Sequence, residues 1–324
     1  MLTAISTNRS ATFTGVSRSL KAHILLILVT LVWGSTFVLI KSALRDASPL
    51  LFNTVRMTLA SVALAALYRG KLRGITREVF RSGVVVGLFL WIGYELQTSG
   101  LRLTTASKSA FLTGVSVVLV PVLLAVFWRK AVNRWTWFGV LMAFAGLYFL
   151  TVPAAGGAFG LEGINLGDLL TIGCAVGFAL QIIFLGRATR RHHFEPIAFL
   201  QAATAAVLMV ITTPLLERPH IMWSPAVISA VLITGLLGTA AAFTIQAWAQ
   251  QFLPATHTAL IFSLEPVFAW ITSFIVLHER LGMRAGAGAA LILGGIILAE
   301  TKGAAEAEPR LSAEDRTSVP ATHS

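Results

Sequence analysis

The residue with the clearest capacity for chemistry is Glu265, which lies inside an apolar stretch and is followed directly by Pro266. A charge near the centre of a membrane span costs about 2.5–3.5 kcal/mol, so a carboxylate there needs a partner, a water-filled cavity or a proton. Pro266 lacks a backbone N–H and frees a carbonyl one turn earlier, which opens the helix at that depth. In one interpretation Glu265 exchanges a proton or binds a cation. The alternative is a structural carboxylate that hydrogen-bonds a neighbouring helix.

Two more charged residues, Glu95 and Arg56, interrupt apolar stretches. Glu95 shares a helical face with Trp91, so it is a candidate for binding a cationic group in an outer vestibule. The alternative is a carboxylate that reaches the membrane surface. Arg56 needs an acidic partner or several carbonyls, and both Glu95 and Glu265 are available. A structural ion pair is favoured for Arg56 over substrate binding.

Uncharged polar and aromatic residues at helical spacing complete the set of candidate substrate-binding residues: Trp33, Thr36, Phe37, Gln181, Gln246 and Trp270. Residues three, four and seven positions apart lie on one face of a helix, so such a set can form the wall of a cavity. Most polar residues in a helix bundle instead hydrogen-bond neighbouring helices. Both interpretations stay open here.

The composition requires a membrane environment for these residues. Of the 324 residues, 56% are hydrophobic and only 12% are charged, with a mean hydropathy of +0.79. Soluble domains carry about 25% charged residues. The single cysteine, Cys174, excludes a disulfide framework, and no cofactor or metal site is indicated. The expected fold class is therefore an all-α polytopic membrane protein.

Ten apolar stretches are long enough to cross a bilayer as helices. They cover residues 23–40, 49–68, 79–99, 106–128, 135–152, 167–186, 196–216, 224–249, 256–277 and 285–300. The expected organisation is a cytoplasmic N-terminal tail (1–22), two five-helix repeats (23–152 and 167–300) and a disordered cytoplasmic C-terminal tail (301–324).

The distribution of lysine and arginine sets the orientation. With the N-terminus inside, the inner segments hold 17 of these residues and the outer loops hold 7, with Arg56 inside a span. Cytoplasmic loops carry the excess of positive charge. The rule therefore accounts for the net charge of +11 without a nucleic-acid partner, and it places both termini in the cytoplasm.

The two halves of the chain are related by a shift of 149 residues. Gln97 then matches Gln246, and the glycines Gly139 and Gly146 match Gly288 and Gly295. Each half has five spans, an odd number, so the second half enters the membrane from the opposite side. The repeats are therefore inverted, and in such proteins the substrate site lies at the repeat interface near the midplane.

Three segments of the chain resemble the EamA-type transporters of the drug/metabolite transporter superfamily: 33–44, 48–64 and 259–299. The most specific part is Leu-Glu-Pro-Val at 264–267 followed by His-Glu-Arg-Leu at 278–281. The first repeat departs from this pattern, with Val117 at the position of Pro266. The resemblance implies a ten-helix carrier in the bacterial inner membrane that moves small metabolites, often outward.

The sequence therefore favours a secondary transporter that exports amino acids or related metabolites by alternating access. In one version of this hypothesis, proton exchange at Glu265 drives the transport. The partners are a small-molecule substrate, the lipid bilayer and protons, and small-residue helix faces leave a homodimer open. One alternative is efflux of cationic drugs, and another is a scaffold or sensor without transport. An enzyme is not expected, because neither a Walker A motif nor His-Glu-x-x-His occurs.

Overall fold

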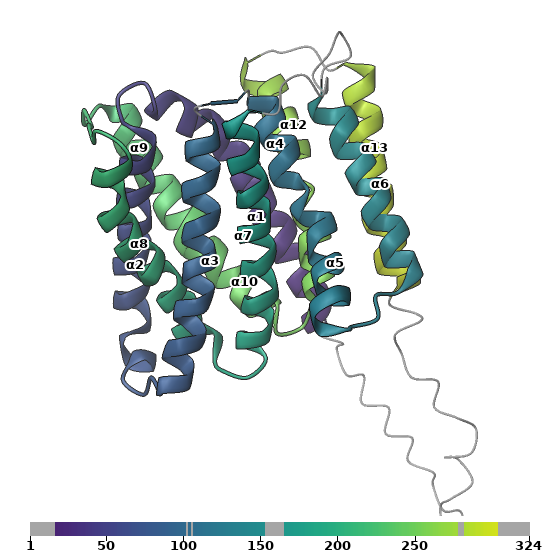
Figure 1. Cartoon of the computed structure of the whole chain (residues 1–324), viewed down its shortest axis with the longest axis horizontal. Helices are drawn as coiled ribbons and strands as arrows, with labels where there is room; N and C mark the ends of the chain where they lie inside the picture. The colour runs from purple at the N-terminus through teal and green to yellow at the C-terminus, as the bar shows by residue number, and fades with distance from the viewer. Residues whose placement is uncertain (1–16, 102, 105, 153–164, 278–281, 304–324) are drawn as a thin grey trace, which may run out of the picture.

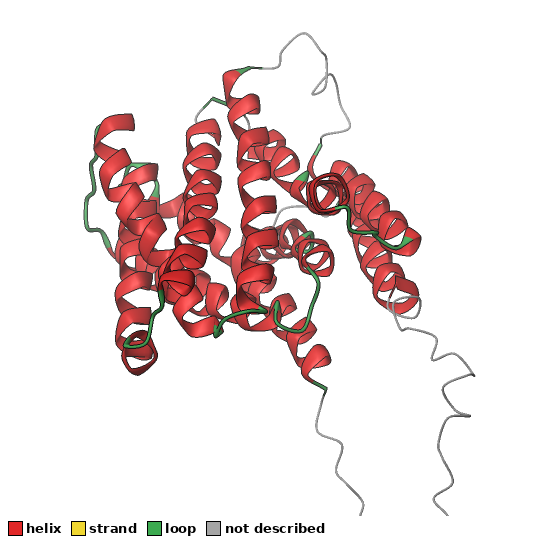
Figure 2. Ribbon diagram, turned by 60° about the horizontal axis from the view of Figure 1, so that its bottom comes forward, coloured by secondary structure: helices red, strands yellow, loops and turns green. Residues whose placement is uncertain are grey.

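The structure is a computed structural model of the chain, and it describes residues 17–101, 103–104, 106–152, 165–277 and 282–303. In these ranges the secondary structure is helical apart from one isolated bridge between Ala47 and Ile221, and the helices form one bundle (Figures 1 and 2). Eight helical stretches of the described chain are long and apolar enough to cross a membrane. The chain is an all-α, multi-pass membrane protein, as its composition predicts.

The described helices can be assigned to the ten predicted crossings, but those predicted at 135–152 and 256–277 are not among the eight long apolar stretches. The first repeat contains α1 (Arg18–Ala43), α2 (Pro49–Leu72), α3 (Arg77–Leu101), α4 (Ala106–Gly114) with α5 (Ser116–Trp128), and α6 (Arg134–Thr151). The second contains α7 (Leu166–Thr189), α8 (Phe194–Leu216), α9 (Pro225–Gly235) with the π-helix η2 (Leu236–Ala241) and α10 (Ala242–Ala249), α11 (Ala255–Phe262) with α12 (Glu265–Leu277), and α13 (Met283–Leu298) with the π-helix η3 (Ala299–Gly303). The predicted turn at 278–281 and most of both predicted tails lie outside the described residues.

Local sequence explains where several helices begin. Asn165 caps α7 by accepting a hydrogen bond from the Asp168 amide, and the Asp168 carboxylate accepts one from the Asn165 amide in return, at 2.9 and 3.0 Å. This capping box satisfies two amides that the helix itself cannot pair. Pro49 and Pro225 open α2 and α9, where proline's missing N–H costs nothing.

Helix packing repeats the relation between the two halves. Equivalent helices pack against each other, α6 along α13 and α2 along α8. The packing of α3 on α7 has its counterpart in the packing of α9 and α10 on α1. The contacts of α4 and α5 with α7 likewise correspond to those of α11 and α12 with α1. A two-fold axis between inverted repeats produces this pairing of contacts.

Four glycines mark this axis where α6 crosses α13. A Cβ atom on Gly146 would lie 2.5 Å from the carbonyl oxygen of Gly288, and one on Gly139 would overlap the carbonyl oxygen of Gly295. The 149-residue shift converts one contact into the other, since it relates Gly139 to Gly288 and Gly146 to Gly295. The glycines therefore serve close helix packing inside one chain.

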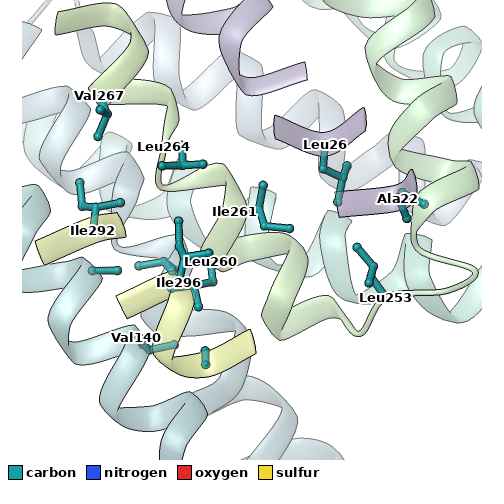
Figure 3. Close-up of a cluster of buried hydrophobic side chains, with 14 of the residues drawn as sticks. Ala22, Leu26, Val140, Leu253, Leu260, Ile261, Leu264, Val267, Ile292 and Ile296 are labelled. Atoms are coloured by element: carbon teal, nitrogen blue, oxygen red, sulfur yellow. The ribbon is translucent and has the colours of Figure 1, made fainter. Parts of the chain in front are cut away.

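The bundle is sealed at one end. We call the end where α1 begins and η3 ends the termini end, and the opposite one the far end (Figure 1). Near the termini end, Ala22 and Leu26 of α1 pack with Leu253, Leu260 and Ile296 in a buried apolar cluster (Figure 3). This cluster joins the first helix of one repeat to the last two crossings of the other.

Candidate functional site

A cavity of about 480 Å³ lies between the two repeats. Its wall reaches the far end at Leu44, Pro49 and Thr151, where α1 ends, α2 begins and α6 ends. From there it extends inward past Arg56 and Glu265. The cavity is therefore reached from the far end, while the apolar cluster seals the termini end.

Buried glutamines form the floor of the cavity. Gln181 of α7 and Gln246 of α10 both line it, and their side chains exchange hydrogen bonds of 3.4 and 3.2 Å. Gln181 also donates to the Gln201 side chain at 3.0 Å, and Gln246 donates to Gln250 at 3.4 Å. These four side chains are at most 2% exposed. These hydrogen bonds allow a polar layer to persist where apolar packing would otherwise continue, although the Gln201 amide nitrogen is buried without a hydrogen-bond partner.

Both broken crossings open at the cavity. The first repeat breaks between α4 and α5, so that Ser116 begins α5, and the second breaks between α11 and α12, so that Glu265 begins α12. The two positions are related by the 149-residue shift, and both line the cavity. A helix that starts inside a membrane protein presents unpaired amides and a positive dipole end. Transporters with inverted repeats form their substrate sites from such half-helices.

Two opposite charges face this cavity from different repeats. Arg56 of α2 is 8% exposed and stacks on the Tyr94 ring, with 4.6 Å between its Cζ atom and the ring centroid. Its Nε atom is buried without a hydrogen-bond partner. Glu265 is exposed to the cavity, and its carboxyl group lies within electrostatic range of Arg56. In the part of the chain that the structure describes, no ion pair of 4.0 Å or less joins the two groups.

Aromatic rings form one side of the cavity. The Trp33 indole lies edge-on to Phe262, with 5.0 Å between ring centroids, and tilted to Phe243 at 5.8 Å. Its Nε1–H donates a 2.7 Å hydrogen bond to the carbonyl oxygen of Gly238 in η2. π-Helical segments leave carbonyls unpaired and are frequent at functional sites. Tyr94 and Phe178 extend this aromatic wall, edge-on at 5.5 Å.

Most of the predicted site residues line this one cavity: Trp33, Thr36, Arg56, Gln181, Gln246, Glu265 and Trp270. The side chain of Phe37 lies outside the described part of the structure. Among the described residues of the wall, Glu265 is the single carboxylate and there is no histidine or cysteine. The wall therefore lacks the ligand set of a metal site.

Glu95 lies elsewhere. It is 5% exposed, and its Oε1 atom accepts hydrogen bonds from Thr212 at 2.6 Å and from Trp91 at 3.2 Å. Thr212 belongs to α8, so Glu95 connects α3 to α8 and is not part of the cavity wall. Arg56 therefore shares the cavity with Glu265, not with Glu95.

Sequence reasoning did not select Tyr94, Phe178, Phe243 or Asn53 as site residues, although all four line the cavity. Tyr94 lies one position before Glu95, about 100° around the helix, because α3 turns that face to the cavity. Phe178 lies three positions before Gln181, and this helical spacing was a signal in the sequence. Nothing in the sequence distinguishes Phe243 from an ordinary packing residue.

Two inverted five-helix repeats, with broken crossings at a shared internal cavity, define an α-helical membrane carrier. The chain matches the EamA-like transporter family over residues 20–152 and 165–301, and it belongs to that family.

Similar proteins agree with this assignment. An uncharacterized transporter of Archaeoglobus fulgidus is 35% identical over 288 residues, which are 88% of this chain and 87% of that protein. The uncharacterized transporter YvbV of Bacillus subtilis is 28% identical, over 88% of this chain and 93% of its own. A solved crystal structure covers 89% of this chain and 99% of its own with a TM-score of 0.73 at 21% identity, a likeness of fold.

Proposed function

We propose that the protein is a secondary transporter for zwitterionic small metabolites of the amino-acid class. The observation that carries this proposal is the pair of opposite charges, Arg56 and Glu265, which face one cavity without a direct ion pair. A substrate carboxylate would bind the guanidinium, and its ammonium group would bind the Glu265 carboxylate. The aromatic wall would hold an apolar side chain.

The charge pair also bears on the alternatives. A cationic drug would find Glu265 and the aromatic wall favourable, but the guanidinium of Arg56 would repel it in the same cavity. A polyanion would find a single cation among the described residues of the wall. A scaffold would have no use for a cavity of about 480 Å³ lined with both charges, whereas a sensor could bind a ligand there and is separated from a carrier by measuring flux.

In the proposed cycle the two repeats rock about the cavity and expose it to each side in turn. The termini end faces the cytoplasm by the positive-inside rule, so the present conformation faces outward from a bacterial inner membrane. Export is the proposed direction, and Glu265 is the proposed proton-coupling residue.

Binding to the purified protein tests the proposal. Saturable thermal stabilisation by amino acids would report a ligand that binds only the folded state. A hydrogen bond to a charged group contributes about 1.5–3 kcal/mol, so we expect Arg56→Gln and Glu265→Gln each to weaken binding about 10- to 100-fold. Glu95→Gln is the matched control, because it changes a buried carboxylate outside the cavity.

Substrate analogues distinguish the contribution of Arg56 to binding from that of Glu265. An amine analogue without the carboxylate should bind weakly, and Arg56→Gln should not weaken its binding further but strengthen it, because the substitution removes the repulsion by the guanidinium. If the amine bound as well as the amino acid, the cationic-drug alternative would replace the zwitterion proposal. If neither cavity variant altered binding or flux in proteoliposomes, the cavity would not be the substrate site.

A further inference from the structure

Three ionisable side chains converge at the termini end, away from the cavity. His23 comes from α1, His257 from α11 and Glu300 from η3. The His23 Nε2 atom lies 2.7 Å from Glu300 Oε2, and the His257 Nδ1 atom lies 2.8 Å from Glu300 Oε1. The side chains of His23, His257 and Glu300 are 22%, 13% and 21% exposed, so the cluster is half-buried and still reachable from solvent.

We propose that His23, His257 and Glu300 form a binding site for a zinc-class transition-metal ion. Two imidazoles and one carboxylate are a known ligand set for zinc, with water as the fourth ligand. The ligand atoms all lie within 4.8 Å of one another. The sequence did not indicate such a site, because its residues are far apart in the chain and belong to no spaced motif.

The hydrogen bond at the other nitrogen of His23 supports a metal-binding role. The Nδ1 atom lies 2.7 Å from the Ser19 carbonyl oxygen, which can only accept, so Nδ1 is the donor. Nε2 lies 2.7 Å from the Glu300 carboxylate, which also only accepts, so both ring nitrogens donate and His23 is an imidazolium paired with Glu300. A metal ion that binds Nε2 takes the place of this proton. Histidines that bind metals commonly fix their other N–H in this way.

The contact between His257 and Glu300 gives a second, independent observation. Glu300 Oε1 is buried and lacks a hydrogen-bond partner among the described groups, although His257 Nδ1 is 2.8 Å away. The contact is therefore close but poorly aligned for a hydrogen bond. In the structure this oxygen has only the ion-pair contact with His257, and a metal ion bound between the two groups would satisfy it with better geometry.

Side-chain rotation is enough to admit an ion, with the most separated pair of ligand atoms, up to 4.8 Å apart, closing to about 3.4 Å. Zinc bonds of about 2.1 Å to nitrogen and oxygen place tetrahedral ligand atoms about 3.4 Å apart. The two contacts of 2.7 and 2.8 Å would therefore widen by about 0.6–0.7 Å, within reach of side-chain rotation. The nearby cations of α1 face rings instead of the site: Arg18 stacks on Phe252 and Lys21 on Trp248.

A bound ion would join α1 to α11 and η3, the same helices that the apolar cluster holds together at the termini end. Opening this end separates those helices, so zinc would slow transport. This consequence depends on the proposed function, whereas zinc binding itself does not. Binding is therefore measured on purified protein without any transport assay.

The test is titration of ZnCl₂ into detergent-purified full-length protein without a polyhistidine tag, followed by calorimetry. We expect about one saturable site per chain, and MgCl₂ should not compete, since magnesium prefers oxygen ligands. His23→Gln, His257→Gln and Glu300→Gln should each weaken zinc binding about tenfold or more. His220→Gln, which changes an exposed histidine elsewhere, should leave binding unchanged.

X-ray absorption at the zinc edge of the wild-type protein counts ligands without any variant, so the proposal stays testable if a variant fails to fold. Two imidazole ligands would support the site. Absence of saturable binding, one or no imidazole, or equal affinity in the three variants and the wild type would each overturn it.

Discussion

The crossing of α6 and α13 makes a sharp prediction about Gly288. A Cβ atom there would lie 2.6 Å from the Gly146 carbonyl oxygen and 2.7 Å from the Leu150 amide nitrogen. Both obstacles are backbone atoms, and ordinary contact begins at 3.4 Å, so Gly288→Ala must push the helices apart by about 0.8 Å. A gap of that size forfeits about a quarter to a half of each dispersion contact, and overpacking costs about 1–3 kcal/mol.

Gly286→Ala is the matched control in the same helix. Its Cβ atom would meet only a Trp270 ring carbon at 3.9 Å, which is ordinary contact. Both substitutions gain the same helix propensity of up to about 1 kcal/mol, so this gain cancels in their difference. We expect Gly288→Ala to be less stable than Gly286→Ala by about 1–3 kcal/mol.

The assay is reversible unfolding in mixed detergent micelles, with SDS as the denaturant and helix content as the signal. Gly146→Ala should behave like Gly288→Ala, because the two positions face each other across the axis. Equal stability of Gly288→Ala and Gly286→Ala would show that the glycine crossing is not as tight as the structure has it, and the argument for close packing at the axis would fail.

Three further predictions concern single features. Trp33→Phe keeps an aromatic ring but loses the hydrogen bond to the Gly238 carbonyl in η2, so the free energy of unfolding should fall by about 0.5–1.5 kcal/mol. An unchanged free energy of unfolding would contradict a structural role for that hydrogen bond. Asn165→Ala removes the N-cap of α7 and should lower the free energy of unfolding by about 1 kcal/mol, whereas Asn165→Ser keeps a capping side chain and should lower it much less. Equal losses of stability in the two variants would refute the capping assignment. In a Cys174→Ala background, a charged maleimide added in detergent should label Thr98→Cys in the cavity wall but not Gln250→Cys, which is fully buried; the reverse pattern would show that the cavity opens at the termini end.

The two repeats have the same plan but carry different chemistry at equivalent positions. The start of the second half-helix in each broken crossing is Ser116 in one repeat and Glu265 in the other. Likewise Glu300, which lies at the sealed termini end, is equivalent to Thr151, which lines the cavity at the far end. Among the described residues, symmetric backbones therefore support an asymmetric arrangement, with Glu265 in the cavity wall and the cluster of His23, His257 and Glu300 at the termini end.

The sequence by itself determined the class of protein and its architecture. Long apolar stretches must form helices in a bilayer, because lipid cannot hydrogen-bond an open backbone. The 149-residue repeat with an odd number of crossings fixed the inversion, and Pro266 located a break beside Glu265. Such features are local or periodic, so they can be recognised without knowing which helices are neighbours.

Tertiary structure decided which polar groups meet. On a helix that is apolar all round, sequence cannot tell the buried face from the cavity face, so the sequence selected Glu95, whereas the structure turns Tyr94 to the cavity and Glu95 to α8. The convergence of His23, His257 and Glu300 likewise depends on three crossings packing together. Each of these contacts joins residues far apart in the chain, and only the packing of whole helices brings them within reach of one another.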